Sequence, residues 1–148
     1  MLFPDPEGAE RGIAFYQEDT DYELPDAEAV RRWLYTCAEA EGGEVYRLEY
    51  TFCSDAYLHR LNVEHLQHDT LTDIITFPMS EVPDPIEGEL FVSVERVRDN
   101  ATDLGIPYEQ ELRRVIVHGL LHLLGYGDKT QAETATMRAK EEEWLEKY

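Results

Sequence analysis

The longest apolar run of the sequence, residues 115–124 (VIVHGLLHLL), most constrains how this chain can fold. A membrane-spanning helix needs about 20 consecutive apolar residues, whereas this run is shorter and contains two histidines. The helical pattern begins after Gly105, has Pro107 at its first turn and continues to Leu124. We therefore predict a buried helix in a protein that does not cross a membrane.

The composition is typical of an ordinary globular protein. The chain has 148 residues, of which 43% are hydrophobic and 30% charged, which predicts one domain over residues 1–148 with a loose arm at residues 1–10. The N-terminus lacks the basic start and apolar stretch of a secretory signal. Cys37 and Cys53 are not in a C-x-x-C spacing, so we interpret both as small core residues of a cytoplasmic protein.

The net charge of the chain argues against nucleic-acid binding over most of its surface. Lys and Arg number 13 and Asp and Glu 32, and the net charge of −19 repels a polyanion over most of the surface. Binding of nucleic acid therefore needs a local basic patch. Four arginines flanking the apolar run are one candidate, although a scattered, solvated set is the favoured interpretation: Arg96, Arg98, Arg113 and Arg114.

Periodicity predicts about four strands and about five helices. Alternating apolar and polar residues, clearest in EVYRLEYTFC, together with β-branched runs, indicate strands at 12–17, 44–53, 73–77 and 89–94, the last after a turn at Gly88. Helical spacing indicates helices starting near Asp26 and Ser54, one at 95–104, one ending at Leu124 and one starting at Thr130. This order predicts a single α+β domain with a small mixed β-sheet.

Three side chains are predicted to cap helices. Asp26 and Ser54 precede two of the helical patterns, and Thr130 with Glu133 forms a capping box for the last helix. The last helix is expected to bury three apolar residues, Met137, Trp144 and Leu145.

Two histidines on the apolar run indicate a metal site. His118 and His122 are four residues apart, so their imidazoles project from one face of a helix and can bind one ion. Gly125 and Gly127 end the helix and let the chain fold back, so that Asp128 returns as a third ligand. Two histidines and one carboxylate leave a fourth position open for water, which is typical of catalytic zinc.

A metal site is not the only interpretation of this pair. A histidine on an apolar helical face is usually a core residue hydrogen-bonded to a carbonyl. Burial favours the metal, because an unpaired buried polar group costs about 1–3 kcal/mol and two imidazoles in this run need strong partners. Gly119 follows the first histidine, where H-E-x-x-H peptidases carry their glutamate, so the chain is not a standard zinc peptidase.

The motif H-G-x-L-H-L-x-G-Y at residues 118–126 resembles the signature of the YbeY family of bacterial rRNA maturation endoribonucleases. The segment LNVEHLQHDTLTDIITF is similar to that family's LN...D..TD...F segment, and GELFVS to its G-D-I strand. The similarity covers roughly residues 45–145 in one register.

The resemblance implies a zinc-dependent endoribonuclease that cleaves single-stranded RNA in the bacterial cytoplasm. It implies a role at the 3′ end of small-subunit ribosomal RNA and in ribosome quality control, with the small ribosomal subunit as partner. Zinc would be held by His118, His122 and Asp128 and would polarise a phosphoryl oxygen. Asp73 and His68 lie in the segment that the resemblance brings near the metal, and they are the candidates for acid or base. A monomer is assumed.

The chain departs from the family pattern at two positions. Asp128 stands where many members place a third histidine, and a carboxylate oxygen makes manganese or another divalent ion a more plausible alternative to zinc. Leu66 stands where many relatives carry an arginine after an aromatic residue, so a cation that could hold the scissile phosphate is missing. His65 or His68 could partly replace that cation.

Two other functions remain compatible with the same residues. The first is a ribosome-associated assembly or binding factor with a mainly structural zinc, which the net charge and the missing arginine favour. The second is a metallohydrolase of another substrate, which a small apolar cleft beside the metal would support.

Overall fold

The computed structural model describes residues 12–66 and 72–148 of the chain. The arm predicted at residues 1–10, His68 and the side chain of Leu66 lie outside the described residues. The described part contains a four-stranded mixed sheet and five helices, which confirms the predicted α+β class.

The sheet places one short strand at an open edge. β1 (Gly12–Glu18), β2 (Val45–Cys53) and β4 (Ile86–Ser93) are parallel neighbours, and β3 (Ile74–Pro78) pairs antiparallel with β4. The order β1-β2-β4-β3 leaves β3 at the edge of the sheet. The predicted turn at Gly88 is wrong, because that residue lies within β4 and pairs with Leu48 of β2 and Pro78 of β3.

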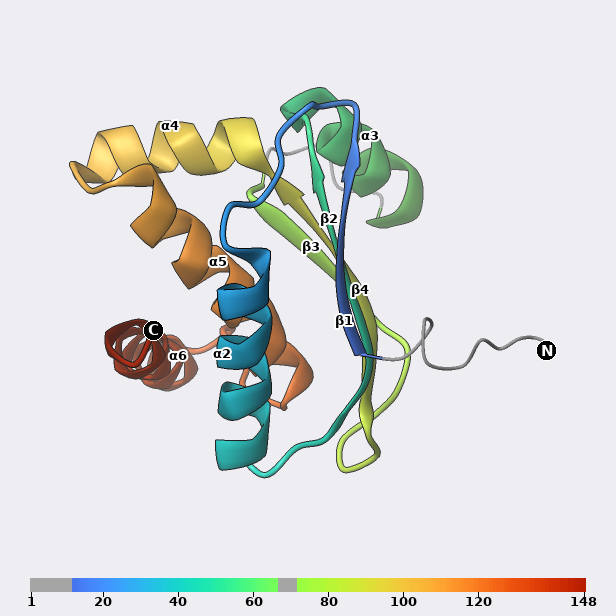
Figure 1. Ribbon diagram of the computed structural model, residues 1–148, viewed down its shortest axis with the longest axis vertical. Helices are drawn as coiled ribbons and strands as arrows, with labels where there is room; N and C mark the ends of the chain where they lie inside the picture. The colour runs from blue at the N-terminus through green and yellow to red at the C-terminus, as the bar shows by residue number, and fades with distance from the viewer. Residues whose placement is uncertain (1–11, 67–71) are drawn as a thin grey trace, which may run out of the picture.

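The helices lie on both faces of the sheet. Figure 1 shows α2, α5 and α6 on one side of the sheet and α3 on the other side, near one end. There α3 contacts β3 and β4. No helix in the described residues is long and apolar enough to cross a membrane. The helices in chain order are α2 (Ala27–Ala40), α3 (Asp55–Leu66), α4 (Val94–Leu104), α5 (Tyr108–Leu123) and α6 (Gln131–Glu146).

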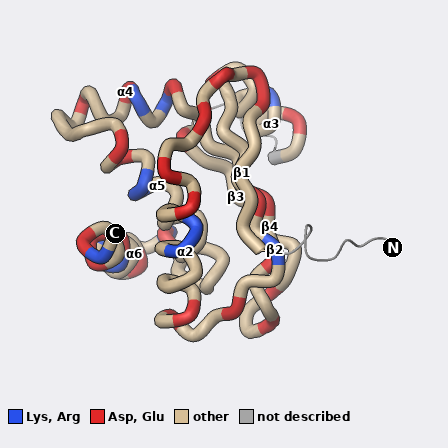
Figure 2. Tube along the Cα trace, viewed as in Figure 1, with Lys and Arg blue, Asp and Glu red and all other residues tan. Residues whose placement is uncertain are grey.

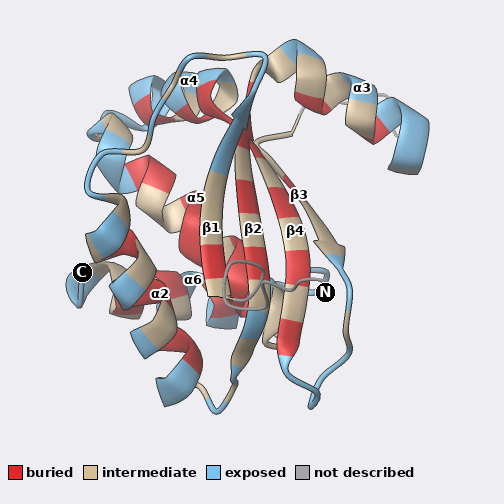
Figure 3. Ribbon diagram, turned by 45° about the vertical axis from the view of Figure 1, so that its right-hand side comes forward, coloured by how far each residue is buried: buried red, intermediate tan, exposed pale blue. Residues whose placement is uncertain are grey.

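The main core lies between the sheet and helices α2 and α5. Alternate residues of β2 point into it, including Leu48, Tyr50 and Phe52, all of which are buried. Figure 3 shows buried segments along the central strands β2 and β4. The Tyr50 hydroxyl donates a hydrogen bond of 2.7 Å to the backbone carbonyl of Ile116, which ties α5 to the centre of the sheet. A smaller cluster of Cys53, Leu58 and Ile75 packs under α3 on the other face.

Gly119 brings α5 very close to the edge of the sheet that β3 forms. A Cβ atom at this position would lie 2.3 Å from Cδ2 of Leu90 in β4 and 3.0 Å from Cδ1 of Ile74 in β3. The absence of a side chain therefore allows the helix to pack against both strands. This close approach places the neighbouring face of α5, which carries His118 and His122, beside β3.

Two of the three predicted helix caps form. The Ser54 hydroxyl accepts a hydrogen bond of 3.0 Å from the backbone N–H of Tyr57, and Thr130 and Glu133 form a complete capping box. The predicted cap at Asp26 is wrong: the residue precedes α2, but its backbone is left-handed (φ 54°) and its side chain makes no capping hydrogen bond. The left-handed backbone gives Asp26 a geometry other than the extended one of an N-cap residue.

Other core predictions are confirmed except at Leu145. Met137 and Trp144 of α6 are buried as predicted, whereas Leu145 is only partly buried. Both cysteines, Cys37 and Cys53, are buried and free.

The four flanking arginines do not form a basic patch. Figure 2 shows Lys and Arg distributed among acidic residues along the chain. Arg96 lies 2.8 Å from a carboxylate oxygen of Asp55, and the guanidinium groups of Arg98 and Arg113 lie over the rings of Tyr108 and Tyr148. Each of these arginines is thus engaged locally, and Arg114 belongs to the site described next.

Candidate metal centre

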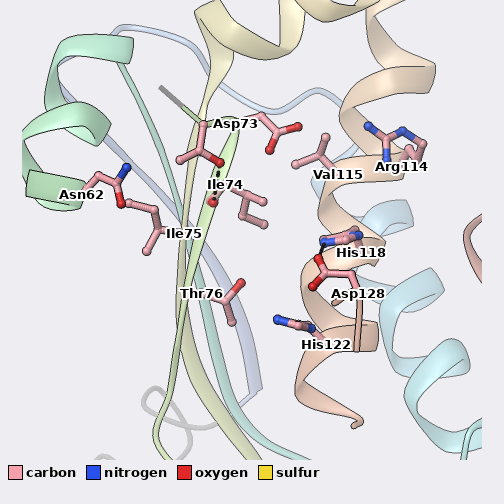
Figure 4. A pocket seen from close by; sticks show the side chains of 11 residues that line it. Asn62, Asp73, Ile74, Ile75, Thr76, Arg114, Val115, His118, His122 and Asp128 are labelled. Atoms are coloured by element: carbon pink, nitrogen blue, oxygen red, sulfur yellow. Dashed lines mark hydrogen bonds and ion pairs between the residues drawn. The ribbon is translucent and has the colours of Figure 1, made fainter. Parts of the chain in front are cut away.

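The predicted ligands line a pocket between the edge strand β3 and helix α5. The pocket has a volume of about 480 Å³ and lies where Gly119 brings the helix close to the strand. Figure 4 shows side chains from both elements facing one another across it. The lining residues are Asn62 of α3, Thr72, Asp73, Ile74, Ile75 and Thr76 of β3 and its approach, Arg114, Val115, His118 and His122 of α5, and Asp128.

The two histidines lie one helical turn apart on the pocket side of α5. Their ring centroids are 5.9 Å apart, and the ring planes differ by 25°. The expectation that both are buried is wrong: the His118 side chain is 21% exposed and His122 is exposed. The buried stripe of α5 instead carries Ile116 and Leu120, because the histidines project from the neighbouring stripe.

Each histidine uses its Nδ1 atom within the protein. Nδ1 of His118 lies 2.6 Å from Oε2 of Glu141, and Nδ1 of His122 lies 2.8 Å from the carbonyl oxygen of Tyr126. A carbonyl oxygen can only accept, so the neutral His122 carries its proton on Nδ1. This leaves its Nε2 lone pair available for a ligand, which is the usual arrangement of metal-binding histidines.

A tight turn brings Asp128 back to the histidines. Gly125 follows α5 with φ +110°, a conformation that residues with side chains rarely adopt. Oδ2 of Asp128 lies 3.7 Å from Nε2 of His118, and the Asp128 carbonyl accepts a hydrogen bond from Thr134 of α6. The turn is therefore held by the start of α6.

The donor atoms fit a divalent ion, although they do not all converge. Bonds of about 2.0–2.2 Å from zinc to nitrogen and oxygen allow two ligand atoms to be up to about 4.2 Å apart, so His118 and Asp128 can share one ion. As the side chains stand, no three His, Cys, Asp or Glu residues of the described chain are grouped closely enough to hold an ion. The structure thus pairs two of the predicted ligands and places His122 beside them.

Asp73 lies on the opposite wall of the pocket. Figure 4 shows it at the start of β3, across from α5. Burial raises the pKa of its carboxyl above the usual value, while the charges of Arg114 and His118 act in the other direction. A carboxyl group with a raised pKa can hold and release a proton closer to neutral pH.

A buried ion network behind the pocket was not predicted. Arg114 donates to the fully buried Glu111 through Nε at 2.9 Å and also through Nη2, and its Nη1 lies 3.1 Å from Oε1 of Glu141. Burial alone would raise the pKa of Glu141, but the hydrogen bond from His118 and the charge of Arg114 lower it below the usual value. The sequence did carry a signal, because Glu141 lies on the same helical stripe as Met137 and Trp144.

Tyr126 fixes the turn that follows α5. Its hydroxyl donates a hydrogen bond of 2.7 Å to Glu41 at the end of α2, and Glu41 also accepts from Lys140 and Trp144 of α6. The carbonyl that orients His122 is therefore anchored to two helices.

The fold and the site together define a class: an α+β protein with a pocket between a helix and the edge of a mixed sheet, lined by two histidines and two aspartates. The family model described as Endoribonuclease YbeY matches residues 13–148. The chain therefore belongs to the YbeY family.

Individual relatives agree with this assignment. The chain is 50% identical to Endoribonuclease YbeY of Cytophaga hutchinsonii over 133 residues, which cover 90% of this chain and 93% of that protein. It is 46% identical to Endoribonuclease YbeY of Amoebophilus asiaticus, over 87% and 88% of the two chains. A Thermotoga maritima protein solved in solution is similar in structure, with a TM-score of 0.68 and 28% identity over 90% of this chain and 87% of that one.

Proposed function

We propose that the protein is a metal-dependent endoribonuclease that cleaves single-stranded RNA. The observation that carries the proposal is the pair His118 and His122, whose rings are held through Nδ1 beside the carboxylate of Asp128. This arrangement occurs in a chain whose relatives are named endoribonucleases. Cytoplasmic maturation of the 3′ end of small-subunit ribosomal RNA, and ribosome quality control, are proposed on the family resemblance.

The charge of the pocket supports a requirement for a cation. Among the described lining residues, Asp73 and Asp128 are acidic and Arg114 is basic, and Arg114 is already paired with two buried glutamates. In a chain of net charge −19, such a pocket does not by itself attract a phosphodiester. A bound divalent ion supplies the positive charge and a Lewis acid for a phosphoryl oxygen.

The proposed ligands are His118, His122 and Asp128, with zinc as the proposed ion. Two imidazoles suit zinc, whereas the carboxylate is a harder ligand that also suits manganese. Asp128 carries a negative charge that a histidine would not, so the net charge of the centre is lower than with three histidines.

Asp73 is the proposed proton donor or acceptor. It lines the same pocket as the histidines, and its burial raises its pKa toward the range where proton transfer is effective. His68 stays a prediction, since it lies outside the described residues.

The comparison of the wild type with His122→Ala tests the proposal. We expect the zinc-loaded wild type to cut an unpaired RNA oligonucleotide, and we expect His122→Ala to lose that activity while retaining its circular dichroism spectrum. His122 is exposed, so its removal should not disturb the core. The measurement is the rate of appearance of cut product on a denaturing gel.

The matched control is His59→Ala, because His59 is a histidine of α3 outside the pocket lining. This variant should cut at the wild-type rate. Equal cutting by His122→Ala would refute the proposed role of the histidines and point to a contaminating nuclease.

A structural metal in a ribosome-associated factor is the second candidate function. The position of Asp128 favours it, because an ion shared with His118 would connect α5 to the turn that packs on α6. The two candidates differ in whether RNA is cut, so the same comparison separates them.

A further inference from the structure

Glu141 of α6 is a fully buried carboxylate with three partners. Oε2 lies 2.6 Å from Nδ1 of His118, and Oε1 lies 3.1 Å from Arg114 and 3.2 Å from Arg138. A buried carboxylate is costly unless hydrogen bonds and opposite charges satisfy its oxygens. The ring of His118 satisfies the oxygen that neither arginine reaches.

The charges around Glu141 indicate which atom carries the proton of its hydrogen bond with His118. Arg114 makes two contacts with Glu111, which is also fully buried, so only its Nη1 atom turns to Glu141. Arg138 is 55% exposed at its side chain, and its charge is therefore screened by solvent. The N–H of His118 is thus a principal partner of the carboxylate, and it requires the proton on Nδ1.

We propose that Glu141 is the positioning residue of His118: its carboxylate fixes the tautomer and the rotation of the ring, so that Nε2 faces the neighbouring Asp128 at 3.7 Å. This inference rests on the proposed metal centre and names the residue that sets its affinity. A histidine ring can turn and has two tautomers, and a short hydrogen bond at Nδ1 removes both freedoms.

The two histidines are consequently unequal ligands. His122 is held by the neutral carbonyl of Tyr126, whereas His118 is held by an anion. The 2.6 Å contact with a carboxylate holds the ring of His118 more firmly than the 2.8 Å contact with a carbonyl holds that of His122, so His118 is the better oriented of the two. Because Glu141 lies in α6, the docking of that helix determines the tautomer and the ring orientation of His118 in α5.

Long-range proton–nitrogen NMR of the histidine rings in the metal-free full chain tests the tautomer without any variant. We expect His118 with its proton on Nδ1 in the wild type. A proton on Nε2 instead would overturn the proposal, even if substitutions at Glu141 fail to fold. This readout does not depend on RNA cleavage.

Zinc affinity, measured by competition with a chromophoric chelator, tests the consequence. We expect Glu141→Gln to weaken zinc binding by about 10- to 100-fold and to leave His118 in a mixture of tautomers. Glu142→Gln makes the same chemical change at the neighbouring exposed position, and Arg138→Gln removes a partner of Glu141 that does not contact His118. Both controls should bind zinc within about threefold of the wild type.

Wild-type affinity and an unchanged tautomer in Glu141→Gln would refute the role of Glu141. A loss of affinity in Arg138→Gln as large as in Glu141→Gln would also refute it, since the effect would then be a general weakening of the network. If the wild type binds no divalent ion but the His118 tautomer changes in Glu141→Gln, the proposed metal function fails and the positioning role of Glu141 stands.

Discussion

At the scale of single residues, the pocket separates groups that can bind an ion from groups that can carry a proton. His118, His122 and Asp128 come from α5 and the turn after it, whereas Asp73 comes from the opposite wall at β3. The separation has a chemical use, because a carboxyl that is not a ligand remains free to exchange its proton. Asp73 is therefore the residue at which the pH dependence of the protein should appear.

Replacement of Asp73 by Asn should slow RNA cleavage and change how the stability of the protein depends on pH. If Asp73 transfers a proton, Asp73→Asn lowers the rate of RNA cleavage by about 10²- to 10⁴-fold. Burial raises the folded-state pKa of Asp73 above its unfolded value of about 3.9, so the folded state binds this proton more tightly. The stabilisation by Asp73 is then present at low pH and is lost as the pH rises through the folded pKa.

The free energy of unfolding, measured with urea between pH 4 and pH 7, checks the sign. The stability of the wild type relative to Asp73→Asn should fall as the pH rises. The control is Gln110→Ala at an exposed position of α5, which changes no titratable group, so its difference from the wild type should stay flat. A wild type that gains relative stability with rising pH would contradict the assigned environment of Asp73.

At the scale of elements, the packing of α5 on the sheet edge positions the pocket. Gly119 should not tolerate a methyl group, because Leu90 is fully buried and has little room to move away. We expect Gly119→Ala to lower the free energy of unfolding by about 1–3 kcal/mol, although alanine favours a helix by about 1 kcal/mol. The control Gln110→Ala, on the exposed side of the same helix, should change stability by less than about 0.5 kcal/mol.

Chemical denaturation of the two variants measures this difference. A Gly119→Ala variant as stable as the wild type would show that α5 can shift away from β3, in which case the pocket is less fixed than its packing indicates. Zinc affinity of the same variant would then report whether the histidines move with the helix.

The elements were predictable where local signals determined them, and the site was predictable only in part. The spacing of His118 and His122 and the capping box at Thr130 depend on near neighbours in the chain, so sequence patterns indicated both. The exposure of the histidines depends on which stripe of α5 meets the sheet, and that is decided by tertiary packing. The role of Glu141 depends on Arg114 and His118 in another helix, which sequence spacing alone does not connect.

At the scale of the whole molecule, the helices around the site are joined by contacts that need no ion. The indole N–H of Trp33 in α2 donates a hydrogen bond of 2.8 Å to the carbonyl of Trp144 in α6. Glu41 accepts hydrogen bonds from Tyr126, Lys140 and Trp144. The docking of α6 is thus stabilised by side-chain hydrogen bonds in which none of the proposed ligands takes part.

Removal of the metal should therefore leave a cooperatively folded protein. We expect a single calorimetric transition in chelator, and addition of zinc at about 100 times its Kd should stabilise the folded state by about 2.7 kcal/mol. For a chain of this size, that corresponds to a rise in Tm of roughly 5–10 °C. A loss of the cooperative transition in chelator would instead support the structural role of the metal, and an unchanged Tm on zinc addition would argue against binding.

The position of α6 after the proposed ligands in the chain has a consequence for synthesis of the protein. Translation proceeds from the N-terminus, so His118, His122 and Asp128 leave the ribosome before Glu141. Until α6 docks, the ring of His118 lacks its carboxylate partner and the turn at Asp128 lacks the contact with Thr134. A nascent chain thus carries all three proposed ligands before the helix that orients His118 has emerged.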